Sequence, residues 1–172
     1  MWATCAFRGA WQRGRSFTID GTENRGQERV TENTPPAESG RILVIEDDAR
    51  LRTIIALQLR DAKDVSYEVR TAEDGIRGLE EVRRDPPELI LLDVMMPGLD
   101  GYEVCRQLKS SPLTSRIPII FLTAKSTFED RLQGLELYAD DYITKPWSQS
   151  ELLFRVRNQL KTRRAQLQSN AS

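Results

Sequence analysis

The chain contains a short apolar run that ends in three adjacent carboxylates, Ile42-Leu43-Val44-Ile45-Glu46-Asp47-Asp48. Three later runs share this design, each leading into a polar side chain: residues 89–92 before Asp93, 117–122 before Thr123, and 142–144 before Lys145. Runs that stay apolar at consecutive positions are typical of parallel strands that helices cover on both faces. Residues 67–70 instead alternate between apolar and polar side chains, which predicts a strand at the edge of the sheet.

The segments between these runs carry apolar residues at the spacing of three and four that marks one face of a helix. The faces are Leu51, Ile54, Ile55 and Leu59; Ile76, Leu79 and Val82; Tyr102, Cys105 and Leu108; Phe128, Leu132 and Leu135; and Leu152, Leu153, Val156 and Leu160. Capping signals precede two of them, from Thr71 to Asp74 and from Ser148 to Glu151. Strands that alternate with helices in this way predict a doubly wound α/β domain.

The composition of the chain changes sharply at Arg41. Residues 1–40 show no apolar period, so we expect a disordered leader there, a domain over 41–161, and a basic helical or flexible tail over 162–172. The two cysteines lie far apart in the sequence and predict a reducing compartment rather than a disulfide framework. The sequence holds no apolar run of the ~18 residues that a membrane span needs, and we expect a cytoplasmic protein.

The 172 residues include no histidine. This absence excludes Ser–His–Asp and Cys–His catalytic sites, zinc sites that use histidine, and a phosphohistidine donor. The 25 basic and 26 acidic residues nearly balance, so the net charge gives no general reason to expect binding to nucleic acid or to an acidic membrane.

In open parallel sheets, ligands bind beyond the carboxyl ends of the strands. The polar residues that follow the predicted strands are therefore expected at one edge of the sheet: Glu46, Asp47, Asp93, Thr123 and Lys145. Carboxylate oxygens suit Mg²⁺, whereas a hydroxyl and an ammonium suit phosphoryl oxygens. Without histidine, a carboxylate is the expected phosphoryl acceptor. Taken singly, these residues also fit a solvated helix start, a turn or a surface charge, but their joint position at one edge favours a functional site.

Four motifs, in this order, resemble the receiver domain of two-component response regulators. They are Ile42-Leu43-Val44-Ile45-Glu46-Asp47-Asp48, Leu91-Leu92-Asp93-Val94-Met95-Met96-Pro97-Gly98-Leu99-Asp100-Gly101, Phe121-Leu122-Thr123-Ala124-Lys125 and Asp140-Asp141-Tyr142-Ile143-Thr144-Lys145-Pro146. The resemblance extends over residues 41–161. It implies the flavodoxin-like fold of the chemotaxis regulators, a five-stranded parallel sheet of order 2-1-3-4-5 with five helices.

The resemblance implies that Asp93 accepts a phosphoryl group from the phosphohistidine of a histidine kinase or of a phosphotransfer protein. It also implies a Mg²⁺ site in which Asp47 and Asp93 bind the ion, Glu46 acts through water, and the backbone carbonyl of Met95 is a further ligand. Asp48 is not expected to bind the metal, because it is placed to cap the first helix.

The resemblance further implies that Lys145 contacts a phosphoryl oxygen, that Thr123 hydrogen-bonds the same group, and that Tyr142 turns inward during the switch. The chain departs from the family at Tyr138, where a glycine usually ends the fourth helix. This departure concerns the face between helix 4 and strand 5, and it does not concern the phosphorylation site.

The leading hypothesis is a phosphorylation-controlled switch without an output domain and without turnover of an external substrate. We expect it to act by binding partners, including a second copy through helix 4, strand 5 and helix 5. One alternative is a receiver fragment of a hybrid kinase or multidomain regulator, which the heptad Leu153, Leu160 and Leu167 indicates. Another is a receiver-shaped binding module that works without phosphorylation. Nucleic-acid binding is not expected, because the basic fifth helix lacks a recognition helix beside it.

Overall fold

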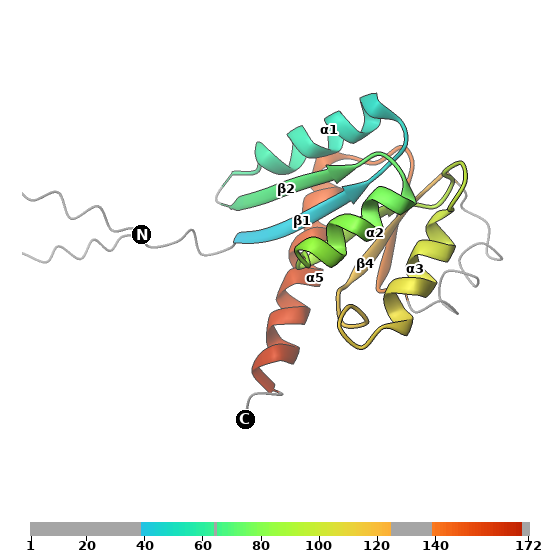
Figure 1. Cartoon of the computed structure of the whole chain (residues 1–172). Helices are drawn as coiled ribbons and strands as arrows, with labels where there is room; N and C mark the ends of the chain where they lie inside the picture. The colour runs from blue at the N-terminus through green and yellow to red at the C-terminus, as the bar shows by residue number, and fades with distance from the viewer. Residues whose placement is uncertain (1–38, 64, 125–138, 170–172) are drawn as a thin grey trace, which may run out of the picture. The chain divides into compact units, whose positions relative to one another are not determined.

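The computed structural model of the chain describes residues 39–63, 65–124 and 139–169. The expected leader up to residue 38, the predicted helix over 128–135, Lys125 and Tyr138 lie outside these residues. The described part contains a parallel sheet of five strands in the order β2-β1-β3-β4-β5, which confirms the predicted fold class (Figure 1). The strands are β1 (Ser39–Ile45), β2 (Ser66–Ala72), β3 (Leu89–Asp93), β4 (Ile119–Thr123) and β5 (Asp141–Thr144).

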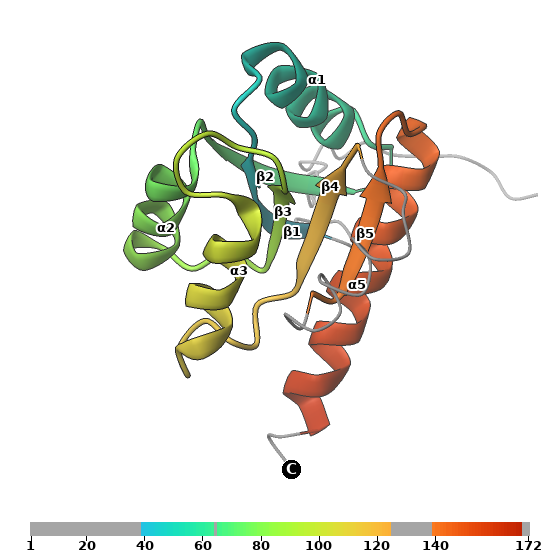
Figure 2. The ribbon, with the colours of Figure 1, turned by 90° about the vertical axis from the view of Figure 1, so that its right-hand side faces the viewer.

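The described helices cover both faces of this sheet. They are α1 (Ala49–Arg60), α2 (Gly75–Arg84), α3 (Gly101–Ser110) and α5 (Gln149–Ser169). Figure 2 shows α1 and α5 on one face and α2 and α3 on the other. Alternate residues of each strand feed the two cores: Ile42 and Val44 pack with α1 and α5, whereas Leu43 and Ile45 pack with α2 and α3. The continuous apolar runs of the sequence are thus strands buried from both sides.

The register of the strands determines which strand ends meet. Ile45 lies opposite Leu92 across the β1–β3 pair, so the next residues of the two strands, Glu46 and Asp93, are neighbours. Thr123 lies opposite Thr144 across the β4–β5 pair, and the Lys145 amide donates to the Thr123 carbonyl at 2.8 Å. The predicted edge strand is also confirmed, because β2 pairs only with β1 and alternates between exposed and buried side chains.

Short polar side chains begin the helices, as the sequence predicts in most places. The Asp48 carboxylate accepts from the amides of Arg50 and Leu51, which confirms it as the cap of α1. The Ser148 hydroxyl accepts from the Glu151 amide at 3.1 Å. The predicted cap at Thr71 is wrong, because β2 continues through Thr71 in register with β1, and Asp74 alone caps α2.

Two predicted core residues are exposed. Ile54 in α1 is 49% exposed and Ile76 in α2 is 61% exposed. The predicted helical spacing is confirmed, but small residues determine which face of each helix packs on the sheet. Ala56 is buried in α1, and Gly78 brings α2 so close to β1 that a Cβ there would lie 2.4 Å from the Ile45 side chain. The positions of large apolar residues in the sequence do not reveal the contacts that alanine and glycine make with the sheet.

The boundaries of the domain differ slightly from those expected. β1 begins at Ser39, inside the segment predicted to be leader, because Gly40 lies against Leu160 and Arg164 donates to the Ser39 carbonyl. At the other end, α5 runs through the start of the expected tail to Ser169. No helix in the described part of the chain combines the length and the apolar character that a membrane span requires.

Cys105 is a cysteine of α3 whose side chain is completely buried. Burial raises the pKa of this thiol to about 11, so the reactive thiolate is scarce at neutral pH. Cys105 is therefore a core residue of the α2–α3 side.

Candidate functional site

Three carboxylates meet at the carboxyl end of the sheet, as the sequence predicts. Glu46 and Asp47 directly follow β1, and Asp93 is the last residue of β3. One ligand oxygen of each lies within 4.8 Å of those of the other two. Glu46 and Asp93 are only 1% and 3% exposed, whereas Asp47 is exposed to solvent. This arrangement, which we call the acidic cluster, places a carboxylate pair in the interior and a third carboxylate at its mouth.

Lys145 joins the two buried carboxylates. Its Nζ donates to Glu46 Oε2 at 3.0 Å and to Asp93 Oδ1 at 2.9 Å. Lys145 directly follows β5, and the β4–β5 pairing carries it to the same edge of the sheet. The resemblance implied a contact between Lys145 and a phosphoryl group. In the structure, the ammonium is shared by the two acids that surround the place where such a group would bind.

Burial and the hydrogen bonds with Lys145 shift the pKa values of Glu46, Asp93 and Lys145 in opposite directions. Burial raises the pKa values of Glu46 and Asp93, and the hydrogen bonds from Lys145 offset this only in part. Neighbouring carboxylates raise both values further, through Asp93 at Glu46 and through Asp47 at Asp93. Burial lowers the pKa of Lys145, but its bonds to Asp93 and Glu46 outweigh this effect and the net change is upward. The carboxylates outnumber the ammonium, so the cluster favours an added cation.

Three other predicted residues lie at the end of β4, within β5 and in the loop after β3. Thr123 ends β4 and is 7% exposed. Tyr142, in β5, is half-buried and packs against the core on the α2–α3 side. Met95 lies two residues beyond Asp93, with a side chain that is 58% exposed, and its backbone hydrogen-bonds the Asp93 carboxylate. The structure thus places Glu46, Asp47, Asp93, Thr123 and Lys145 at the carboxyl ends of the strands, and it joins Glu46, Asp93 and Lys145 by direct contacts, whereas Tyr142 lies within β5.

A tight loop holds the end of β3, and sequence reasoning did not assign it a role. Gly98 has a φ of +80°, which favours glycine. Gly101 approaches the strand so closely that a Cβ would lie 2.2 Å from the Asp93 carbonyl oxygen. The Gly101 amide also donates to the Val94 carbonyl at 3.0 Å. The two glycines of this motif were the signal that could have identified the loop.

Arg52 was also missed by sequence reasoning. Its Nη1 donates to the backbone carbonyls of Glu46 at 2.6 Å and of Asp47 at 3.2 Å. No spacing rule connects an arginine in a helix with carbonyl groups of the preceding loop. Only the folded chain shows that Arg52 contacts the backbone of the acidic cluster.

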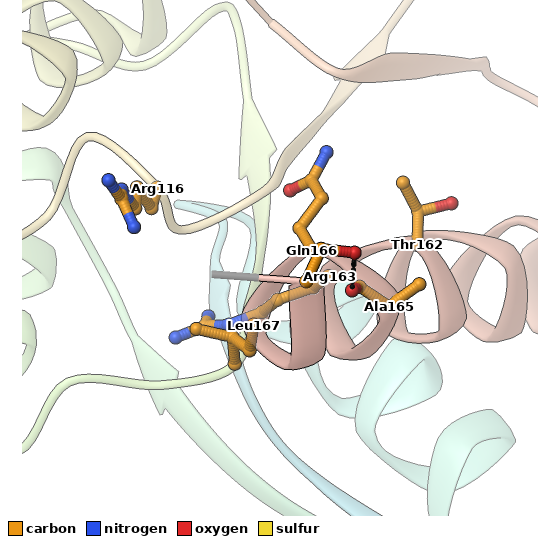
Figure 3. Close-up of a pocket in the computed structure, with 7 residues that line it drawn as sticks. Arg116, Thr162, Arg163, Ala165, Gln166 and Leu167 are labelled. Carbon is orange, nitrogen blue, oxygen red and sulfur yellow. Dashed lines mark hydrogen bonds between the residues drawn. The ribbon is translucent and has the colours of Figure 1, made fainter. Parts of the chain in front are cut away.

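Two surface grooves lie at different ends of the strands, and one of them begins at a residue that contacts the acidic cluster. A groove of about 350 Å³ begins at Lys145 and runs along α1, lined by Leu51, Ile54, Gln58, Pro146 and Trp147. A larger groove of about 600 Å³ lies between Arg116 and the last turns of α5 (Figure 3). Arg163, which lines it, donates to the carbonyls of Pro87 and Glu88, just before β3 begins. The larger groove is therefore at the opposite end of the strands, and none of the described residues that line it carries a carboxylate.

Comparisons with known proteins agree with this geometry. A family model described as "Response regulator receiver domain" matches residues 42–157. The probable transcriptional regulator ycf27 of Porphyridium aerugineum is 47% identical over 121 residues, which are 70% of this chain and 48% of that protein. Response regulator PleD of Caulobacter vibrioides is also 47% identical over 121 residues, which are 26% of its length. The chain thus spans about half of the first relative and about a quarter of the second.

Solved structures show the same architecture. A putative response regulator from Chloroflexus aurantiacus superposes with a TM-score of 0.67 at 35% identity, covering 72% of this chain and 99% of that one. Chemotaxis protein CheY4 of Vibrio cholerae superposes with a TM-score of 0.65 at 27% identity, covering 70% of this chain and 98% of that one.

Proposed function

Because the chain belongs to the family of response regulator receiver domains, the regulators of two-component systems, we propose that Asp93 is its phosphoacceptor. The phosphoryl donor is the phosphohistidine of a histidine kinase or of a phosphotransfer protein. An oxygen of Asp93 attacks phosphorus, the bond between phosphorus and the imidazole nitrogen breaks, and the electron pair of that bond remains on the imidazole. The acyl phosphate then controls which partner the domain binds.

The observation that carries this proposal is the position of Asp93. Its carboxylate is almost completely buried at the end of a central strand, in contact with Lys145 and close to both Glu46 and Asp47. A structural ion pair would need one acid and one base. The excess of carboxylates supports a site for charged ligands over a receiver-shaped module that works without phosphorylation.

The donor set of the acidic cluster fits Mg²⁺. The cluster offers oxygen ligands only, and Mg²⁺ prefers a few carboxylates together with water. We propose Asp47, Asp93 and the Met95 carbonyl as direct ligands, with Glu46 acting through water. When bound, the ion neutralises the repulsion among the carboxylates and the charge of the incoming phosphoryl group.

Lys145 and Thr123 respond to the new phosphoryl group. Lys145 already lies 2.9 Å from Asp93 Oδ1, and its ammonium is a suitable contact for a phosphoryl oxygen. We propose that the Thr123 hydroxyl moves toward the same group and that Tyr142 turns inward behind it. The changed face includes β5 and the start of α5, and its readout is partner binding or association of two copies.

The wider properties of the protein follow from this role. As a regulator, it assists its own phosphorylation and dephosphorylation but turns over no external substrate. Its proposed compartment is the cytoplasm, and the wide separation of the two cysteines in the sequence supports a reducing environment.

Incubation of the whole chain with acetyl phosphate and Mg²⁺, followed by intact mass measurement, tests the proposal. Wild type should gain the mass of one phosphoryl group, and Asp93→Asn should gain none, because an amide is not a nucleophile under these conditions. Glu80→Gln is the matched control, since Glu80 is an exposed acid paired with Arg77 and should be labelled like wild type. Undiminished labelling of Asp93→Asn would refute the assignment.

A further inference from the structure

Arg52, in the first turn of α1, binds three consecutive carbonyl groups. Its Nη1 donates to the carbonyls of Glu46 and Asp47, at 2.6 and 3.2 Å. Its backbone amide donates to the Asp48 carbonyl at 2.8 Å, as part of the helix. One residue therefore contacts the backbone of all three acids that follow β1.

Apart from the Lys145 bond to the Glu46 side chain and the capping bonds of the Asp48 side chain, the backbone of the turn that carries these acids has few other hydrogen bonds among the described residues. The Glu46 amide donates to the Ala72 carbonyl at 3.2 Å, and the Asp48 amide donates to Glu46 Oε1 at 3.3 Å. Asp47 is exposed, so packing does little to hold its side chain in place. The Arg52 guanidinium is charged, and hydrogen bonds from charged donors are roughly twice as strong as neutral ones.

We propose that Arg52 is a positioning residue for the metal site. It contacts the carbonyl oxygens of Glu46 and Asp47 and holds the backbone so that the Asp47 carboxylate stays within ligand distance of Asp93 and Glu46. The inference rests on the proposed function, because it concerns the same acidic cluster. Groups that orient metal ligands from behind commonly change metal affinity by about 10- to 100-fold when they are removed.

The surroundings of Arg52 indicate that its side chain can be shortened without loss of the fold. Arg52 is only half-buried and lines an open groove of about 240 Å³ together with Glu73 and Arg77. Water can therefore reach the carbonyls of Glu46 and Asp47 and satisfy them when the guanidinium is absent. What water does not replace is the restraint on the turn.

The test compares Arg52→Met with Arg60→Met in the full chain. Arg60 lies on the same helix, and its Nη2 donates to the Val69 carbonyl at 2.9 Å, away from the acidic cluster. Arg52→Met loses two hydrogen bonds from arginine to backbone carbonyls and Arg60→Met loses one, so both variants share the kind of effect on stability that such a loss causes. The binding of Mg²⁺ alone is measured by calorimetry and by intrinsic fluorescence. Arg52→Met should weaken it about tenfold or more, and Arg60→Met should leave it unchanged.

Two further measurements separate positioning from a merely structural role. Labelling of Arg52→Met by acetyl phosphate should return close to the wild-type rate at saturating Mg²⁺, because the nucleophile itself is intact. Arg52→Lys, which keeps the charge and a donor but lacks the planar fork, should show intermediate Mg²⁺ affinity. If Arg52→Met does not melt cooperatively, the Arg52→Lys titration decides, and wild-type affinity there overturns the inference.

Other outcomes are equally decisive. Wild-type Mg²⁺ affinity in Arg52→Met, or equal weakening in Arg52→Met and Arg60→Met, overturns the inference while leaving the proposed function intact. If the wild-type chain binds no Mg²⁺ and is not labelled on Asp93, the proposed function fails and the role of Arg52 fails with it.

Discussion

Lys145 holds two buried carboxylates with one ammonium, and this sharing determines the charge of the site at rest. Glu46 and Asp93 would each prefer to be protonated when buried, and the hydrogen bonds from Lys145 oppose that tendency. Buried charges are stable only when they are paired and hydrogen-bonded. The lysine therefore opposes the upward shift of the Asp93 pKa and favours the ionised acceptor, which a nucleophile requires.

Replacement of Lys145 by methionine should destabilise the domain by about 1–3 kcal/mol at neutral pH, because two buried carboxylates lose their charged donor. Urea unfolding in the absence of Mg²⁺ measures this loss. The carboxyl pKa values are already above their ordinary range when folded, so the folded state binds more protons than the unfolded state. Loss of the ammonium raises these carboxyl pKa values further, so the folded variant takes up more protons than wild type on acidification, and the loss of stability should shrink as the pH falls below neutral.

The double variant Glu46→Gln with Lys145→Met is the internal control for that experiment. It removes one of the two carboxylates along with the ammonium, and it should recover part of the lost stability. A double variant that is no more stable than Lys145→Met would show that packing of the lysine stem, rather than charge, causes the effect.

At the scale of the element, the loop between β3 and α3 controls the position of the acceptor strand. Gly101 begins α3 against the last peptide groups of β3, and its amide bonds to the Val94 carbonyl. A side chain at Gly101 would overlap the Asp93 carbonyl oxygen at 2.2 Å, a separation that real Cβ atoms do not show. Either the strand end or the helix must then move, and the acceptor carboxylate is attached to that strand end.

Gly101→Ala should therefore lower both stability, by about 1–3 kcal/mol, and the rate of Asp93 labelling by acetyl phosphate. Gly98→Ala is the matched control in the same loop. Gly98 has a φ of +80° but open space around its Cβ position, so its substitution should cost only about 1 kcal/mol of backbone strain. Equal labelling rates in the two variants would contradict the role of Gly101 in placing the acceptor.

The helices show how far a periodic pattern can be taken. The spacing of apolar residues correctly predicted α1, α2, α3 and α5, and short polar residues correctly marked the starts of α1 and α5. The buried faces of α1 and α2 are rotated about the helix axes relative to the predicted faces. Ala56 and Gly78 pack toward the sheet, while the larger Ile54 and Ile76 face solvent. Close packing favours the side chain that fits the space at its position, and the neighbouring strand determines the size of that space.

In the described domain as a whole, the sheet connects the acidic cluster with the surface that β5 and α5 form. Thr123 and Lys145 are joined by a backbone hydrogen bond next to the β4–β5 pair, and β5 is tied to α5 through the ion pair between Asp141 and Arg155. A shift of Thr123 toward a phosphoryl group would thus be transmitted to β5 and α5. Such a path is a physical route for a two-state switch.

The phosphoryl mimic beryllofluoride, added with Mg²⁺, should change amide hydrogen exchange in β5 and in the first turns of α5. α2 lies on the other face of the sheet and serves as an internal reference that should not change. Asp93→Asn treated in the same way is the control for binding elsewhere. Exchange differences limited to the residues around Asp93, with no change in β5 or α5, would contradict the proposed switch.

The sequence alone was sufficient to predict the class of fold and the identity of the acidic residues. Strands and helices follow from local apolar periodicity, and parallel strands oblige the residues at their carboxyl ends to share one edge. Glu46, Asp47, Asp93 and Lys145 could be named for that reason. The tertiary structure decided how they are connected: the shared ammonium of Lys145, the contact of Arg52 with the carbonyls, and the close approach of Gly101. These contacts join atoms from different elements, and their distances depend on strand register, helix rotation and side-chain reach, which no local pattern encodes.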